Sequence, residues 1–513
     1  MRRERETTNN SLTSSFTRRA FIGGVGAGAA IVALDLDAAI AASARAEAEG
    51  TLVNNFGRVF NLPAFAAATA QTRAALTEMG KLGGIMDAKD PLHEGPIRLI
   101  TNPELSPNNR DNPFNTAGTT FFGQFLDHDM TFDNRSPLGV PTRPELSPNE
   151  RTPVFDLDTV YGGGPTASPQ LYNADRITMR VESGGLFEDL PRNANGSAII
   201  GDDRNDENMM ISGLQAAFLL FHNRVVALLR EQGTPPAQLF ATARRTVTWH
   251  YQWIILNEFL PQIIGRPLVD HILAFGRQFY RPPGAPFIPV EFQIAYRFGH
   301  SMIRPSYRAN LAGDNGQPFF GFIFDPVAEG QADPVDLRGG RRAPRRFIGW
   351  QTFFNFGDGE LRLNKRMDTT VSTPLFQLPL STIPSNDPPI SLATRNLLRH
   401  LTWSLPSGQR LATAMGIPQV ETPELAPYGF ATSAPLWYYV LKEGKDLGDG
   451  IQLVGVGARL IGEVFIGLLQ KDPNSYLTVQ PTWRPTLPSR SAGTFGMVDL
   501  LRFAQVDPAS RGQ

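Results

Sequence analysis

The chain has 513 residues, of which 41% are apolar, and this is enough material for a large hydrophobic core. Its net charge of −1 argues against electrostatic capture of nucleic acid or of an anionic membrane surface. The chain contains no cysteine, which excludes disulfides, thiolate metal sites and a lipoprotein anchor, and its 48 glycines and 42 prolines indicate long ordered loops.

The N-terminus has the pattern of an export signal. Arg18 and Arg19 precede a weakly apolar, Gly/Ala-rich run from Gly23 to Leu34, which is too short to span a bilayer. Paired arginines before such a run are typical of the twin-arginine route, which exports folded proteins. We therefore expect residues 1–46 to be a twin-arginine signal read by the export machinery, and the protein to be periplasmic or secreted. The alternative is a chance arginine pair in a tail.

The segment FFGQFLDHDMTF, residues 121–132, combines phenylalanines with acids, an amide and a histidine. Read as a helix, it places Gln124 and His128, four residues apart, on one face. Asp127 and Asp129 flank the histidine, and carboxylates in an apolar run are costly to bury unless something pairs with them.

Two carboxylates recur in RTPVFDLDTVYGGG, residues 151–164. On an extended chain, Asp156 and Asp158 project from the same side, and with the hydroxyl of Thr152 and a nearby carbonyl they form part of an oxygen shell that suits calcium. Such a shell needs another acid from elsewhere. The alternative is a solvated turn before a run of glycines.

Two further clusters have functional and structural interpretations. In GDDRNDENMM, residues 201–210, Arg204 and Glu207 stand three apart, although acids there also suit the N-terminus of the following helix. In AYRFGHSMIRPSY, residues 295–307, His300 lies among apolar residues, where a histidine is more often part of a core than a ligand.

The periodic segments are helical and indicate a mainly α protein. Apolar residues recur at spacings of three and four in residues 208–233 and again in 249–261, where Pro261 is expected to end the helix. Residues 453–472 form a third such segment. We expect one α-rich region from about residue 55 to 510.

Taken together, the clusters resemble the animal-type haem peroxidases of the peroxidase–cyclooxygenase superfamily, which includes myeloperoxidase and lactoperoxidase, and most strongly its bacterial members. Five motifs occur in family order: QFLDHD (124–129), DLDTVYG (156–162), DDRNDEN (202–208), RFGHSMIRP (297–305) and RNLLR…LPSGQ (395–409). The resemblance implies a helical fold with long ordered loops around a buried haem. It divides the chain into an N-terminal extension (47–85), a peroxidase domain (86–475) and a C-terminal tail packed on that domain (476–513).

The resemblance also implies roles on the peroxide side of the haem. His128 corresponds to the distal histidine, Gln124 to the glutamine that orients distal water, and Arg204 to the catalytic arginine. Asp127 and Glu207 match the carboxylates that become ester-bonded to haem b.

On the other side of the haem, His300 corresponds to the proximal iron ligand and Asn396 to the asparagine that hydrogen-bonds it. Arg297 and Arg399 fall where arginines meet the haem propionates. The implied calcium ligands are Asp129, Thr152, the carbonyl of Val154, Asp156 and Asp158.

The implied activity is the oxidation of small donors by hydrogen peroxide through a ferryl intermediate. Myeloperoxidase-type sites carry a methionine directly after the ester-forming glutamate, and it helps them to oxidise chloride. Here that residue is Asn208, and Met209 is one position further along, about 100° away on a helix. We therefore expect small anionic or phenolic donors, namely bromide, iodide, thiocyanate and phenols, with no nucleic acid partner and no stable membrane anchor.

Two other functions fit the same family resemblance. Fatty-acid dioxygenases and cyclooxygenases carry a reactive tyrosine three residues before the proximal histidine, whereas here that position is Arg297, and Tyr296 is one residue off. A secreted adhesion protein of the same fold, without turnover, is the second alternative. Against it, every catalytic position is filled, and residues 476–513 do not resemble an adhesion module.

Overall fold

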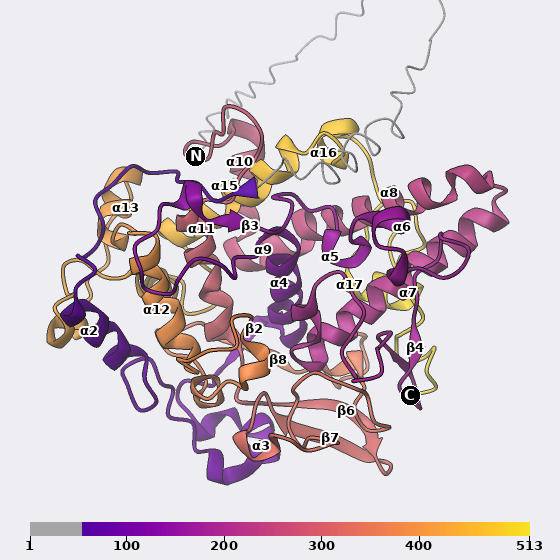
Figure 1. Cartoon of the computed structure of the whole chain (residues 1–513), viewed down its shortest axis with the longest axis horizontal. Helices are drawn as coiled ribbons and strands as arrows, with labels where there is room; N and C mark the ends of the chain where they lie inside the picture. Colours follow the sequence, from indigo (N-terminus) through magenta and orange to yellow (C-terminus); the bar gives the residue numbers. More distant parts are fainter. Residues whose placement is uncertain (1–53) are drawn as a thin grey trace, which may run out of the picture.

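The computed structural model describes residues 54–513, which are mainly helical (Figure 1). The predicted export signal, residues 1–46, lies outside the described residues. The longer helices are α2 (Ala70–Gly80), α4 (Ala117–Met130), α7 (Met209–Glu231), α8 (Pro236–Ile254), α10 (Arg266–Phe275), α12 (Leu392–Thr402), α14 (Leu436–Leu447) and α15 (Gly455–Lys471). The shorter ones are α3 (Gly95–Thr101), α5 (Asp158–Tyr161), α6 (Gly164–Ala167), α9 (Leu260–Ile264), α11 (Val290–Ala295), α13 (Gly408–Met415), α16 (Tyr476–Val479) and α17 (Met497–Phe503).

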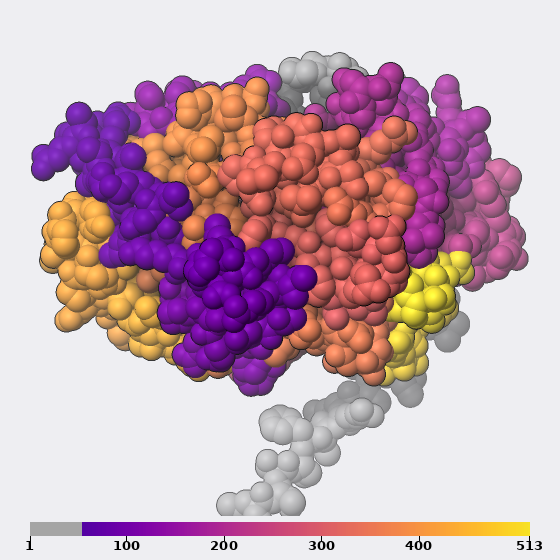
Figure 2. Space-filling view, turned by 90° about the horizontal axis from the view of Figure 1, so that it is seen from below, coloured from indigo at the N-terminus to yellow at the C-terminus, as the bar shows by residue number. Residues whose placement is uncertain are grey.

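The strands are short and pair two by two in antiparallel fashion. The pairs are β1 (Asn54–Asn55) with β3 (Pro148–Asn149), β2 (Asp111–Thr116) with β8 (Leu363–Lys365), β4 (Glu182–Ser183) with β5 (Glu188–Asp189), and β6 (Ser306–Asp314) with β7 (Gln317–Phe322). Ser306 faces Phe322 across the longest pair. Helix α3 packs on this hairpin, and Figure 2 shows indigo N-terminal residues against the salmon surface that includes it. Two-stranded ribbons of this kind cover a helical protein without forming a sheet core.

Helix α4 lies at the centre of the molecule and carries the first predicted motif. It packs against α7 on one side and against the 3-10 turn Tyr296–Met302 on another. The rings of Phe125 and Phe218 stack between α4 and α7, with centroids 4.6 Å apart and planes 7° from parallel. Burial of α4 on several sides holds its polar residues in place, and it brings two predicted motifs face to face.

Helix α7 is a long, apolar helix in the described part of the chain. By length and composition it could cross a membrane, but 72% of its most apolar window is buried inside the fold. The side chain of Asn208 caps its N-terminus by accepting a 3.0 Å hydrogen bond from the backbone N–H of Ile211. Its hydrophobicity therefore belongs to the protein core.

Two of the three predicted helices are confirmed, and the third differs from the prediction. Residues 208–233 and 453–472 contain α7 and α15, as expected. The predicted helix 249–261 is instead the end of α8, which begins at Pro236 and continues through a π-helical turn at Ile255–Phe259 into α9. Pro261 does not end the helix, because it falls in the first turn of α9, where its missing N–H costs nothing.

The C-terminal residues pack on the same hydrophobic core as the rest. Trp483, Phe495 and Leu500 are buried and belong to the cluster that also contains Phe56 and Phe121. Helix α17 lies against α7. The boundaries at residues 85 and 475 stay predictions.

The basic stretch at residues 332–347 has a structural role in this fold. The backbone N–H of Met209 donates to the carbonyl of Leu337, and that of Gly339 donates to the carbonyl of Glu207, both at 2.9 Å. A side chain at Gly339 would put its Cβ 1.4 Å from the carbonyl oxygen of Asp206, so only glycine allows this approach. The stretch thereby holds the segment that carries Arg204 and Glu207.

Candidate active site

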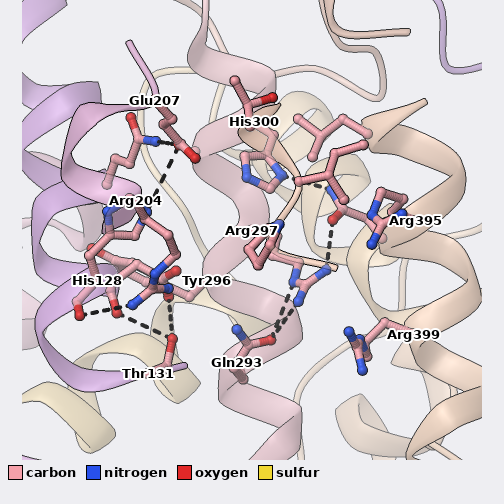
Figure 3. Close-up of a pocket in the computed structure, with 18 of the residues that line it drawn as sticks. His128, Thr131, Arg204, Glu207, Gln293, Tyr296, Arg297, His300, Arg395 and Arg399 are labelled. Carbon is pink, nitrogen blue, oxygen red and sulfur yellow. Dashed lines mark hydrogen bonds and ion pairs between the residues drawn. The ribbon is translucent and has the colours of Figure 1, made fainter. Parts of the chain in front are cut away.

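A cavity of about 410 Å³ lies between α4, the 3-10 turns Asp203–Asp206 and Tyr296–Met302, and α12. It is lined by every residue that the resemblance assigns to catalysis or to haem: Gln124, Asp127, His128, Arg204, Glu207, Arg297, His300, Asn396 and Arg399. Figure 3 shows His128, Arg204 and Glu207 on one side of it, across from Arg297, Arg395 and Arg399. Residues far apart in sequence thus meet at one site.

His128 is buried in the last turn of α4 and is a neutral imidazole. Burial first, and then the positive charge of Arg204, lower the pKa of His128 to about 3. Its Nδ1 lies 2.7 Å from Oδ1 of Asn205, and its Nε2 lies 4.0 Å from Oε1 of Glu207. A neutral histidine with one nitrogen held and the other facing a cavity is suited to accept a proton there.

Gln124 and Glu207 are joined directly beside His128. The amide nitrogen of Gln124 donates to Oε1 of Glu207, and Asn208 donates to Oε1 of Gln124 at 3.2 Å. Burial raises the pKa of Glu207 to about 8, despite the charge of Arg204, so this carboxyl group is largely protonated at neutral pH. Gln124 and His128 share a face of α4, as the helical spacing predicted.

Arg204 is fixed by contacts that the sequence analysis did not identify. It forms an ion pair with Asp202, with Nη2 2.6 Å from Oδ2, and it donates to the backbone carbonyl of His128 at 3.0 Å. Its guanidinium lies 4.3 Å from the ring centroid of Phe132. Although burial would raise the pKa of Asp202, Arg204 holds it well below the usual range. The cation is therefore permanently charged and oriented toward the last turn of α4, which carries the histidine.

His300 lies on the facing 3-10 turn and is also neutral, because burial first and Arg297 second lower its pKa to about 3. As predicted, Asn396 contacts it: the amide nitrogen lies 2.7 Å from Nδ1 of His300. The amide oxygen accepts a 2.7 Å hydrogen bond from Arg297, so the nitrogen must face the histidine. This orientation differs from the one that iron ligation through Nε2 needs, in which Nδ1 donates to the amide oxygen. The amide must turn, and release Arg297, before that role is filled.

Three guanidinium groups, of Arg297, Arg395 and Arg399, gather on one wall of the cavity. Arg399 donates to Oδ2 of Asp133 at 3.3 Å, while Arg297 is held by the neutral amides of Gln293 and Asn396. Burial, and then repulsion from Arg399, lower the pKa of Arg297 to about 9. This wall has a surplus of positive charge and fits a ligand that carries carboxylates.

Two further groups that line the cavity, Asp127 and Tyr296, complete the site. Asp127 accepts a 3.1 Å hydrogen bond from the hydroxyl of Thr131, and burial raises its pKa. The hydroxyl of Tyr296 donates to the carbonyl of Gly123 at 2.9 Å, which ties the turn of His300 to α4. Asp127 faces the cavity from the helix of His128, as the resemblance implied.

Three carboxylates, one from α4 and two from the loop before α5 and its first residue, converge at the predicted calcium site. Oxygen atoms of Asp129, Asp156 and Asp158 lie within 4.8 Å of one another. The sequence predicted that an extended chain places Asp156 and Asp158 on one side, and this prediction is wrong. Leu157, between these two acids, has a left-handed φ of 62°, and Asp158 begins α5. The left-handed residue turns the second carboxylate back toward the first.

The three carboxylates fit a calcium ion. Oδ1 of Asp129 and Oδ1 of Asp158 are buried and accept no hydrogen bond among the described residues. Burial and the charge of Asp158 raise the pKa of Asp129 well above its usual range, and burial and Asp156 raise the pKa of Asp158 to about 7. Mutually repelling oxygen ligands of this kind suit a hard divalent cation. Thr152 lies beside them, with its N–H 3.1 Å from Oδ2 of Asp158, and Val154 lies in the same loop.

Comparison with known proteins finds a family match in the central segment of the chain. Residues 135–318 match the animal haem peroxidase family. Mouse (Mus musculus) eosinophil peroxidase is 29% identical over 226 residues, which cover 38% of this chain and 31% of that protein. Human thyroid peroxidase is 24% identical over 308 residues, 53% of this chain and 31% of that protein. The chain thus spans about a third of the length of these relatives.

The fold is similar to that of a solved peroxidase structure. Peroxidase A from Dictyostelium discoideum superposes with a TM-score of 0.58 at 16% identity, covering 88% of this chain and 93% of that structure. The mainly α, peroxidase-like fold expected from the sequence is therefore confirmed. The matched family segment contains Arg204, Glu207 and His300, while His128 and Asn396 lie outside it and join the site only in the folded chain.

Proposed function

We propose that this chain is a haem peroxidase, an oxidoreductase that uses hydrogen peroxide to oxidise small donors. The observation that carries the proposal is the pair of neutral histidines, His128 and His300, from different elements lining one cavity. One stands beside a fixed arginine and the other contacts an asparagine. Family similarity supports the same conclusion.

The cavity fits haem b on the chemistry of its lining. His300 is a neutral imidazole that would hold the iron, and Arg297 and Arg399 would meet the two propionates. Arg395, which the sequence analysis did not single out, adds a third cation to that wall. The carboxyl groups of Asp127 and Glu207 line the cavity, in positions from which ester links to the haem would form.

Bound haem would supply an iron that coordinates peroxide and accepts its oxidising equivalents. The residues of this chain then move the proton of peroxide and stabilise the negative charge that develops on its oxygen. Nε2 of His128 takes a proton from peroxide and returns it to the departing oxygen, so that water leaves. Arg204, held by Asp202, stabilises the negative charge that develops as the oxygen–oxygen bond breaks. Gln124 holds the protonated Glu207 and orients water beside His128.

The first test is a spectrum of the purified, haem-loaded full chain before and after addition of hydrogen peroxide, followed by donor screening. A haem absorption band that changes with peroxide and returns on addition of a donor supports the proposal. A haem band with negligible peroxide-dependent oxidation would favour the non-catalytic alternative.

We expect bromide, iodide, thiocyanate and phenols to be oxidised readily and chloride poorly. Asn208, directly after Glu207, is committed to Gln124 and to the cap of α7, while Met209 is buried in the core and is not among the residues that line the cavity. A methionine sulfur therefore does not reach the haem from this segment. Rates of bromination and chlorination of a standard acceptor at neutral pH measure the preference for bromide over chloride. Met209→Leu should leave this preference unchanged. Chlorination as fast as bromination would contradict this expectation.

Ester links from Asp127 and Glu207 should form only after exposure to peroxide, because joining a carboxyl group to a haem methyl is an oxidation carried out by the site. Denaturing extraction should release haem from freshly loaded protein, and progressively less after small additions of peroxide. Asp127→Asn and Glu207→Gln should each keep more haem extractable than the unchanged protein. Haem that stays fully extractable after turnover would show that both groups only hydrogen-bond.

We also propose that Asp129, Asp156 and Asp158, with Thr152 and the carbonyl of Val154, bind a structural calcium ion. The convergence of three carboxylates, with the fully buried Asp129 among them, supports this site. Export by the twin-arginine route, with a periplasmic or secreted location, is consistent with a protein that binds its cofactor before export and stays a prediction from the sequence.

A further inference from the structure

We propose that Asn205 is a positioning residue that decides which ring nitrogen of His128 faces the cavity. Its side chain is fully buried, and its Oδ1 lies 2.7 Å from Nδ1 of His128. The proposal deepens the function proposed above and rests on it, since it concerns the histidine to which we assign proton transfer. Asn205 itself does not line the cavity, so it acts through His128.

The orientation of the Asn205 amide is fixed by a chain of buried hydrogen bonds. Its Nδ2 donates to Oγ1 of Thr159 at 2.7 Å and to Oε1 of Gln215 at 2.8 Å. Gln215 in turn donates through Nε2 to the backbone carbonyl of Thr159 at 3.4 Å, and a carbonyl can only accept. Both hydrogens of the Asn205 amide are thus used on the side away from His128. Only its oxygen is left for the histidine.

Because Oδ1 of Asn205 can only accept, Nδ1 carries the proton and donates it whenever the ring of His128 is neutral. Nε2 is then the unprotonated nitrogen, and it faces the cavity near Glu207. This is the tautomer that a base for peroxide requires. In the other tautomer, a proton would already occupy Nε2, and two acceptors would face each other at 2.7 Å.

The chain of hydrogen bonds also connects the base to the proposed calcium loop. Thr159 directly follows Asp158, and it is held by both Asn205 and Gln215. Removing the acceptor at position 205 would leave the Nδ1–H of His128 buried without a partner, which favours the tautomer with its proton on Nε2. The histidine would stay in place but lose its function as a base.

The test compares Asn205→Leu with Asn205→Asp in the haem-loaded full chain, using cyanide as the probe. Hydrogen cyanide binds ferric haem only after its proton is transferred to a base, and the shift of the haem absorption band follows its association. Asn205→Leu should bind haem normally and associate with cyanide about 10–100-fold more slowly, the effect of a buried donor left unpaired. Asn205→Asp keeps an acceptor for Nδ1–H and should associate within a few-fold of the unchanged protein.

Neither replacement can donate to Thr159 and Gln215, so a purely structural role would slow both variants equally, and that result would overturn the proposal. An Asn205→Leu variant as fast as the unchanged protein would overturn it as well. If Asn205→Leu fails to fold, the double variant Thr159→Val, Gln215→Leu frees the Asn205 amide to turn, and a few-fold slower association is expected. An unchanged rate there would overturn the claim that the amide is locked. Failure of the unchanged protein to bind cyanide would instead overturn the proposed function.

Discussion

Replacing His300 with alanine should abolish tight haem binding, whereas His128→Ala should retain haem and slow the reaction with peroxide by about 10²–10⁴-fold. The difference follows from the two positions. His300 lies on the wall with Asn396 and the arginines that would meet the propionates, so its loss removes the only protein ligand that we assign to the iron. His128 stands beside Arg204 and is not a residue that we assign to the iron, so its loss removes a proton acceptor.

Haem content after gel filtration and the rate of the peroxide-induced change in the haem band measure these two effects separately. His271→Ala is a matched control, because His271 is exposed on α10 and should change neither quantity. Equal loss of haem in both variants would contradict the assignment of the two sides. Retention of tight haem binding by His300→Ala would show that another residue holds the iron.

The interpretation of residues 121–132 as a helix agrees with α4, because both faces of that helix are specified by the sequence. Phe121, Phe122 and Phe125 are buried in the core, and Gln124 and His128, one turn apart, face the cavity. The resemblance then brought together motifs that local reasoning could not place in space. All nine residues assigned to catalysis or haem line one cavity, although their roles stay predictions.

The sequence did not reveal features that depend on which polar groups meet after folding. Asp202 precedes Arg204 by two residues, a spacing common in solvated segments, and only the fold shows the ion pair. The turned amide of Asn396 depends on Arg297, 99 positions away along the chain. Leu157 gave no signal of a left-handed conformation, because a bulky apolar residue rarely adopts it. Its strain is the cost of bringing Asp158 back to Asp129.

Removing calcium should reduce peroxidase activity and the melting temperature together, because the ligands of the proposed ion are connected to both His128 and Arg204. Asp129 is covalently next to His128, and its Oδ2 accepts a hydrogen bond from the buried Tyr251 at 3.0 Å. On the other side, Arg151 lies 3.6 Å from Asp158 and 2.9 Å from Asp202, the partner of Arg204. Loss of the cation would leave three closely spaced carboxylates repelling one another and would loosen both connections.

Exhaustive chelation, with the metal content verified, should lower the free energy of unfolding by about 3 kcal/mol relative to protein in calcium at about 100 times its Kd. Activity should fall more steeply, since a displacement of the base by about 1 Å costs on the order of 100-fold. Asp156→Ala should reproduce both effects in the presence of calcium, whereas Asp270→Ala, which removes an exposed carboxylate on α10, should reproduce neither. If chelation with confirmed loss of metal changed neither activity nor melting, the three carboxylates would have to be stabilised by protonation alone, and the calcium site would be wrong.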